Sequence, residues 1–203
     1  MCTIIRSNER LIADTDIKCV KMLQIMEDEN GNPVYVTPYY FKHVPEAILK
    51  GEVPFVAEGD DILSYNAYGN TYQVNGGFIH VYPHDVKKEF FLNDLADLCS
   101  AVGETDCYFT NKMADENNRN QIPGVDPYAI VKGIALFEAI IPKGTEYMIG
   151  FDGNGYDCSN VIYTAKQIVF TGEPVIIDID NCDEDFDCPK YDKIFGKIAK
   201  LKK

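Results

Sequence analysis

The longest apolar run in the chain predicts a strand that is buried on both faces. It covers residues 133–141, GIALFEAII, and ends at the Pro-Lys-Gly sequence of 142–144. Successive side chains of a strand point to opposite faces, and both faces of this run are apolar apart from Glu138. Proline lacks a backbone N–H and glycine accepts a positive φ, so pairing should break after the run. We predict an interior strand and a turn, with 145–150 returning as its partner.

Shorter patterns of the same kind predict further strands. Residues 17–26 and 34–37 flank Asn30-Gly31-Asn32, a sequence typical of a hairpin turn, so these two segments should pair antiparallel. Weaker strand patterns occur at 3–5, 53–56, 62–65, 79–82, 106–110, 165–170 and 174–179. A largely antiparallel, twisted sheet or pair of sheets follows from this order.

Two segments have helical periodicity. Residues 85–102 begin at Asp85, a suitable N-cap, carry an apolar stripe and are followed by Gly103. Residues 191–201 form a second amphipathic segment with lysines near its end. A single turn or two is expected at 45–50, closed by Gly51. The sequence therefore predicts an α+β fold with one main helix and a C-terminal helix.

Length and composition fit one globular domain over residues 1–203. The 203 residues are 46% hydrophobic and 12% aromatic, which is enough to form a substantial core. An acidic linker at about 178–189 is expected to lead to the terminal helix.

The chain is strongly acidic, with a formal net charge of −13 and a pI near 4.6. A field of this sign repels phosphates, so direct nucleic-acid binding and association with anionic membranes are disfavoured. The negative charge suits a basic protein partner, which could be a protein that ordinarily binds nucleic acid. Acidic surfaces also serve solubility. The sequence leaves the oligomeric state open.

The beginning of the chain lacks the apolar core of a signal peptide, and no run reaches the ~18 apolar residues of a membrane helix. A cytoplasmic location is expected. The seven cysteines are odd in number and scattered without a Cys-x-x-Cys motif, which favours reduced thiols. No metal site is predicted, because the closest pair, Cys182 and Cys188, has no histidine nearby.

Glu138 is the candidate catalytic residue. Burial among aliphatic neighbours disfavours the charged form of a carboxylate unless a partner or a cleft relieves it, and such groups concentrate at functional sites. The alternative is that this end of the strand lies at the surface and that Glu138 is simply solvated.

Three further residues are candidate ligand-binding residues: His80, Tyr82 and Tyr72. Tyrosines at 65, 68, 72 and 82 accompany glycines at 69, 76 and 77, and aromatic side chains beside flexible backbone can line a groove. His80 and Tyr82 share a face of their predicted strand, and a histidine there can bind a ligand or transfer a proton. The structural alternative is a histidine hydrogen-bonded at a sheet edge.

Two local resemblances involve the central run. The segment 137–147, FEAIIPKGTEY, together with Gly77-Phe78-Ile79-His80, resembles elements of small uncharacterised bacterial and phage proteins with a C-terminal IPKGTxY segment. The first segment is also similar to the catalytic strand of toxin-type and phage-type mono-ADP-ribosyltransferases. That resemblance implies that Glu138 holds the nicotinamide ribose of NAD and stabilises an oxocarbenium charge.

The chain departs from the transferase pattern at three places. Lys18 and Lys21 stand where the family has an arginine or histidine, Leu136 replaces the usual acid or amide, and the Ser-Thr-Ser strand falls at 79–82. Three hypotheses therefore remain, of which the first is an intracellular accessory or interaction protein linked to a phage or mobile element. The others are an ADP-ribosyltransferase-like enzyme, active or degenerate, and a small-ligand-binding protein. NAD is implied only by the second.

Overall fold

The computed structural model describes residues 3–4, 10–37, 43–57, 62–67, 70–75, 79–84, 132–152 and 160–178. These residues form antiparallel strands and one short helix, α1 (Glu46–Leu49), so the fold is mainly β and the expected α+β class is wrong. The expectation depended on helices at 85–102 and 191–201, which lie outside the described residues, as does the linker beyond Asp178 and the strand expected at 106–110. Within the described part, alternating apolar and β-branched residues form strands instead.

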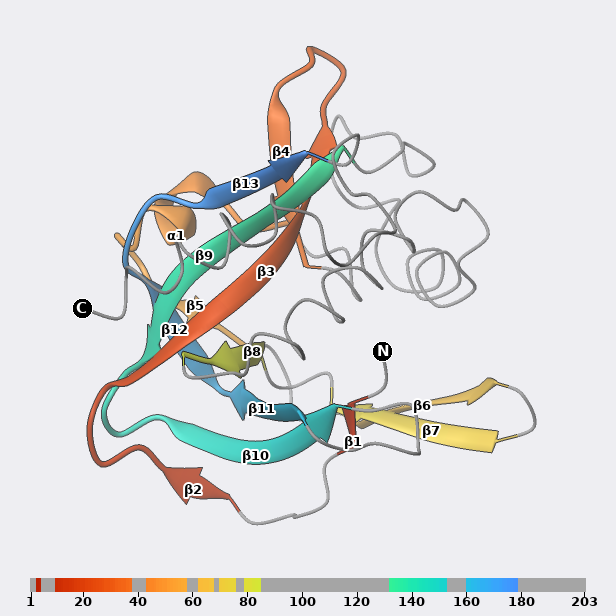
Figure 1. The fold of residues 1–203 in the computed structure, drawn as a ribbon, viewed down its shortest axis with the longest axis vertical. Helices are drawn as coiled ribbons and strands as arrows, with labels where there is room; N and C mark the ends of the chain where they lie inside the picture. The colour runs from red at the N-terminus through yellow and green to blue at the C-terminus, as the bar shows by residue number, and fades with distance from the viewer. Residues whose placement is uncertain are drawn as a thin grey trace, which may run out of the picture. The chain divides into compact units, whose positions relative to one another are not determined.

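The chain divides into two compact units. The first comprises residues 1–21, 50–87 and 138–172, and the second comprises 22–49, 88–137 and 173–203. Two long strands, β3 (Ile17–Glu27) and β9 (Gly133–Ile141), contribute residues to both units. In Figure 1 these two strands run side by side, as their pairing requires.

The first unit contains most of the sheet. Its strand order is β1-β10-β11-β8-β3-β9-β12-β5, with β2 paired to β10, and β6 and β7 form a separate hairpin. The bounds are β1 (Thr3–Ile4), β2 (Leu11–Ile12), β5 (Phe55–Val56), β6 (Ile62–Ala67), β7 (Asn70–Asn75), β8 (Ile79–Pro83), β10 (Glu146–Asp152), β11 (Asn160–Ala165) and β12 (Gln167–Phe170).

The second unit adds β4 (Pro33–Val36), which pairs with β3, and β13 (Val175–Asp178), which pairs with β9. The predicted hairpin between β3 and β4 is confirmed. Its turn is held by Asp28, whose Oδ1 accepts hydrogen bonds from the backbone N–H groups of Asn30 and Asn32, and by Gly31 at φ 79°. These bonds lower the pKa of Asp28, the side-chain bond from Asn32 contributing most. The rings of Tyr35 in β4 and Phe137 in β9 pack edge to face.

The prediction that 133–141 is an interior strand is confirmed. β9 lies between β3 and β12 and is buried at every position from Gly133 to Phe137, on both faces. After that point burial alternates: Ala139 and Ile141 are buried, whereas Glu138 and Ile140 are partly exposed. The face of β9 that carries Glu138 and Ile140 is therefore partly exposed to solvent near the C-terminal end of the strand.

The prediction that 145–150 pairs back with the central run is wrong. β10 pairs with β11, β2 and β1, and its neighbours do not include β9. The turn after β9 exists, with Gly144 at φ 85°, but the segment before β3 binds it. Gly144 N–H donates to the carbonyl of Ala13, and Ala13 N–H donates to the carbonyl of Thr145. This contact, distant in sequence, directs the chain away from β9.

The short helix predicted at 45–50 is confirmed as α1, and Gly51 follows it at φ 69°. Gly51 packs so tightly against β12 that a β-carbon there would overlap the carbonyl oxygen of Phe170. The position thus requires glycine for two reasons, backbone conformation and space.

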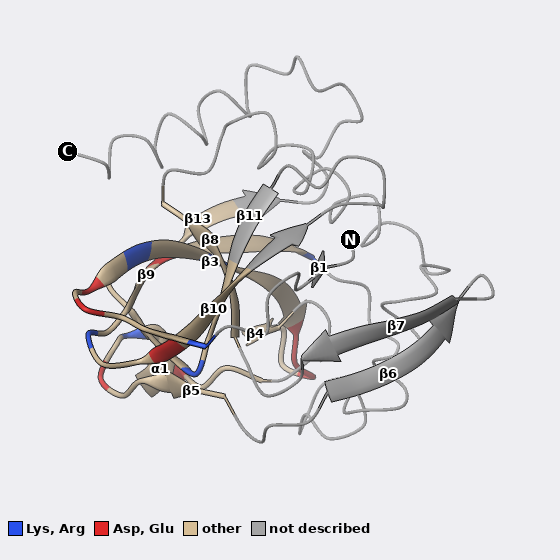
Figure 2. Cartoon of the chain, turned by 90° about the horizontal axis from the view of Figure 1, so that it is seen from below, with Lys and Arg blue, Asp and Glu red and all other residues tan. Residues whose placement is uncertain are grey.

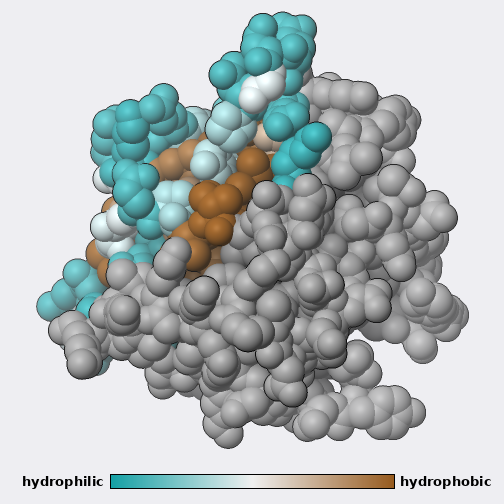
Figure 3. All heavy atoms as spheres, turned by 45° about the horizontal axis from the view of Figure 1, so that its top comes forward, coloured by the Kyte–Doolittle hydropathy of each residue, from teal (hydrophilic) through white to brown (hydrophobic). Residues whose placement is uncertain are grey.

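Charged and apolar residues occupy different places in the described part of the structure. Figure 2 shows acidic residues mainly in turns and at strand ends. Figure 3 shows a band of hydrophobic residues between hydrophilic ones on the face it presents. No helix in the described ranges is long and apolar enough to span a membrane.

Candidate functional site

Glu138 lies on the face of β9 that opens, and its side chain is 27% exposed. The next residue on this face, Ile140, pairs with Val169 of β12, and both are partly exposed. On the opposite face Ala139 and Phe170 pair and are buried. The side chain of Glu138 is therefore neither fully buried nor fully exposed to solvent.

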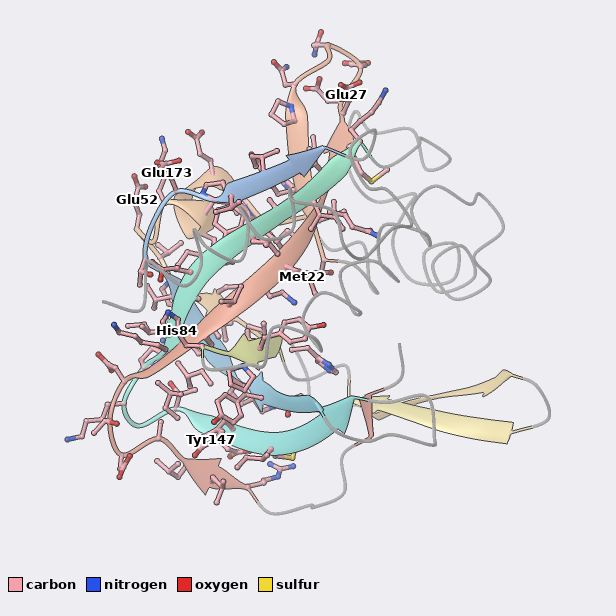
Figure 4. All side chains as sticks on the ribbon, viewed as in Figure 1. Met22, Glu27, Glu52, His84, Tyr147 and Glu173 are labelled. Carbon is pink, nitrogen blue, oxygen red and sulfur yellow. The ribbon has the colours of Figure 1, made fainter. Side chains whose placement is uncertain are left out.

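The side chain of Glu138 lies beside a histidine that the sequence analysis did not select. His84, directly after β8, has its Nε2 atom 3.5 Å from Glu138 Oε1, and its side chain is 14% exposed (Figure 4). His84 is fixed through its backbone N–H, which donates to the carbonyl of Lys18 on β3. The geometry is that of a loose ion pair, because Nε2 makes no hydrogen bond within the described residues.

The strand pairing of β9 shifts at Glu138. Ala139 pairs with Phe170 and Leu136 pairs with Val175, so three steps along β9 correspond to five along the neighbouring chain. The carbonyl of Glu138 accepts a hydrogen bond from Thr171 N–H at the start of this irregular stretch. Such interruptions re-aim side chains and are frequent beside functional sites.

His80 and Tyr82 lie on one face of β8, as predicted, and His84 follows the strand in a turn. Thr164 of β11 pairs directly with His80, so its side chain points to this face too. His80 is partly exposed, Tyr82 and Thr164 are buried, and Thr164 is 0% exposed. We call Thr164, His80, Tyr82, His84 and Glu138 the polar face; all five belong to the first unit.

Tyr72 is not brought to the polar face by strand pairing. It pairs with Tyr65 in the separate β6–β7 hairpin. Glu138 contacts His84, which lies four residues after His80 in the chain. Among the described residues, no group of three or more histidine, cysteine, aspartate or glutamate side chains could hold a metal ion.

A buried amine lies on the side of the sheet opposite Tyr82. Lys21 of β3 is 7% exposed, and its Nζ donates a hydrogen bond of 2.9 Å to the backbone carbonyl of His80. Burial lowers the pKa of Lys21 to about 8, and the neighbouring Cys19 opposes this shift. Burial raises the pKa of the Cys19 thiol to about 12, against the effect of Lys21. Cys19 and Lys21 share the face of β3 opposite Val20, the residue that pairs with Tyr82.

Sequence reasoning missed His84, Thr164 and Lys21. The two-residue period from His80 through Tyr82 continues to His84 and was a usable signal. A single threonine or lysine within a predicted strand gives no such signal, because threonine is common in strands and lysine is usually exposed. Comparison of the chain with protein-family models, with curated proteins and with solved structures finds no match.

Proposed function

We propose that the protein is a cytoplasmic accessory protein that acts by binding a basic protein partner, in a phage or mobile-element setting. The observation that carries the proposal is an acidic, partly apolar segment at the edge of the first unit's sheet. Val53 lies just before the terminal strand β5 and Val56 lies within it, and the two residues are 46% and 49% exposed. Residues 51–61 contain four acidic residues and no basic one.

The backbone of β5 has hydrogen-bonding groups on its outer side. Ala57 N–H donates to the carbonyl of Lys166, which places the groups of Val56 on the side away from β12. In the described part of the chain no strand pairs with β5 on that side. Three acidic residues, Glu58, Asp60 and Asp61, follow Ala57 directly in the sequence. An extended basic segment with apolar side chains fits this combination.

We expect immobilised protein to retain a basic partner at a stoichiometric level, and the Val53→Lys/Val56→Lys double variant to lose it. Both lysines add positive charge to the surface that the partner approaches and remove apolar contact. Ile12→Lys is the matched control, since Ile12 is 62% exposed on β2. Retention should fall as salt increases, because screening acts on exposed charges. Equal retention by the double variant, or no stoichiometric partner, contradicts the proposal.

A second candidate is an NAD-using enzyme of the ADP-ribosyltransferase type with Glu138 as the catalytic residue. It is favoured by the partial exposure of Glu138 and by His84 beside it, since a carboxylate with a nearby imidazole can stabilise developing positive charge and transfer protons. The lysines at 18 and 21 remain a departure from that family, and Lys21 is buried.

Under this second function, we expect the wild-type protein to transfer label from labelled NAD or to hydrolyse NAD. Glu138→Gln should lower that rate at least about 100-fold, because the substitution removes charge stabilisation in the transition state. Glu146→Gln is the control, because Glu146 is a similarly exposed glutamate paired with Arg10. Wild-type protein without transfer, hydrolysis or NAD binding ends this candidate.

A further inference from the structure

The turn between β3 and β4 contains an exposed Asn-Gly sequence (Figure 1). Asn30 and Gly31 are both exposed, and no atom lies within 4 Å of where a β-carbon of Gly31 would be. An asparagine is chemically labile where the backbone nitrogen of the next residue can reach its side-chain carbonyl carbon. Glycine leaves that nitrogen unshielded because it has no side chain. Both reacting groups therefore lie at the surface of this turn.

We propose that Asn30 is a site of spontaneous deamidation, with water as co-reactant, and that Asp28 limits its rate. The Gly31 nitrogen loses its proton to hydroxide and attacks Cγ of Asn30. The bond from Cγ to the side-chain nitrogen breaks, and that nitrogen takes up a proton and leaves as ammonia. Water then opens the resulting five-membered imide at one of its two carbonyl carbons and returns a proton to the Gly31 nitrogen. The product is an aspartate or an isoaspartate at position 30.

Asp28 restrains both reacting groups. Its Oδ1 accepts hydrogen bonds of 2.9 and 2.8 Å from the backbone N–H groups of Asn30 and Asn32, and the carboxylate also interacts with the side chain of Asn30. Gly31 N–H donates to the carbonyl of Asp28 at 3.0 Å. The attack needs this N–H released and the Asn30 side chain turned towards it. The turn must therefore open locally before Asn30 reacts.

Asn32 supplies an internal comparison within the same turn. It is exposed like Asn30, but the next residue is Pro33. The proline nitrogen carries no proton and is already bonded to the ring, so it cannot attack the side chain of Asn32. Deamidation should therefore affect position 30 and leave position 32 unchanged.

The test is incubation of the full chain at mildly alkaline pH, followed by proteolysis and tandem mass spectrometry of the peptide that contains residues 28–33. Localisation to this peptide matters because the sequence has two other Asn-Gly pairs, at 75–76 and 154–155. We expect a mass gain of about 1 Da at position 30, as ammonia is lost and water is added, and a rate that rises with pH.

Two variants separate the reaction from its restraint. Asp28→Ala should gain the mass about fivefold faster or more, because the hydrogen bonds that keep the turn closed are lost. Asn30→Gln should abolish the gain at position 30, since attack on the longer side chain requires a less favourable six-membered ring. An unchanged mass at position 30 over a period in which the urea-denatured chain is converted overturns the proposal. A gain at Asn32, or an equal rate in Asp28→Ala, does so too.

Discussion

Replacement of Gly51 by alanine is expected to destabilise the protein by at least about 3 kcal/mol. Left-handed backbone costs a residue with a β-carbon about 1–2 kcal/mol, and here the β-carbon also overlaps the Phe170 carbonyl oxygen. That oxygen belongs to backbone in β12, so the overlap cannot be relieved by rotating a side chain. Either the turn at Gly51 or β12 itself must move.

Gly144→Ala supplies the matched control for this prediction. Gly144 has φ 85°, but no atom lies within 4 Å of where its β-carbon would be, so only the backbone cost of about 1–2 kcal/mol applies. Urea unfolding of both variants measures the difference. Equal losses of stability would contradict the close packing of Gly51 against β12.

Replacement of Lys21 by methionine is expected to stabilise the protein by about 2 kcal/mol at pH 7. Burial lowers the pKa of Lys21 from 10.5 to about 8, so keeping the amine charged in the folded protein at neutral pH costs about 3 kcal/mol. Part of the gain is offset by loss of the hydrogen bond to the His80 carbonyl. Methionine has a similar length and no charge.

The pH dependence identifies the cause. Between pH 8 and 10.5 the unfolded chain binds the Lys21 proton more tightly than the folded one, so wild-type stability gains from this residue as pH rises. The advantage of Lys21→Met should therefore be complete below pH 8 and vanish by about pH 10.5. Lys143→Met, at an exposed turn, should show no such trend. A pH-independent difference between Lys21→Met and wild type would contradict the burial of the charged amine.

Cys19 contributes with the opposite sign. Its thiol has a pKa of about 12 in the folded protein against 9.0 ordinarily, so the unfolded chain loses the proton first and stability falls as pH rises above 9. Between pH 9 and 10.5, a rise in pH therefore increases the stability of the folded protein through Lys21 and decreases it through Cys19. Urea unfolding of Cys19→Ala across this range should show the rise caused by Lys21 without that opposition.

The strands were predictable where the signal is local. Residues 17–26 alternate and are followed by Asn30-Gly31-Asn32, so strand, turn and return strand follow from neighbouring residues. The partner of β10 was not predictable in this way, since it depends on bonds between Ala13 and the turn at 144–145, more than 100 residues away. Helical periodicity at 85–102 and 191–201 gave too much weight to α structure in the fold class.

The site was predictable for residues that break a pattern. Glu138 is the only charged residue in the apolar run 133–141, and His80 is one of three histidines in the chain. The pairing of Glu138 with His84 depends on the order β8-β3-β9, which no local pattern contains. Thr164 has no distinguishing sequence feature. Only the structure shows that it is buried opposite His80.

The central claim is that the outer edge of β5 binds an extended basic segment of a protein partner. Backbone amide chemical shifts, recorded by NMR during titration with a peptide of alternating lysine and valine residues, test it most directly. We expect the peptide to shift the amides of Phe55, Val56 and Ala57 and to leave the distant turns at Gly31 and Gly144 unchanged. Shifts that avoid these three residues, or a spectrum that the peptide leaves unaltered, would contradict it.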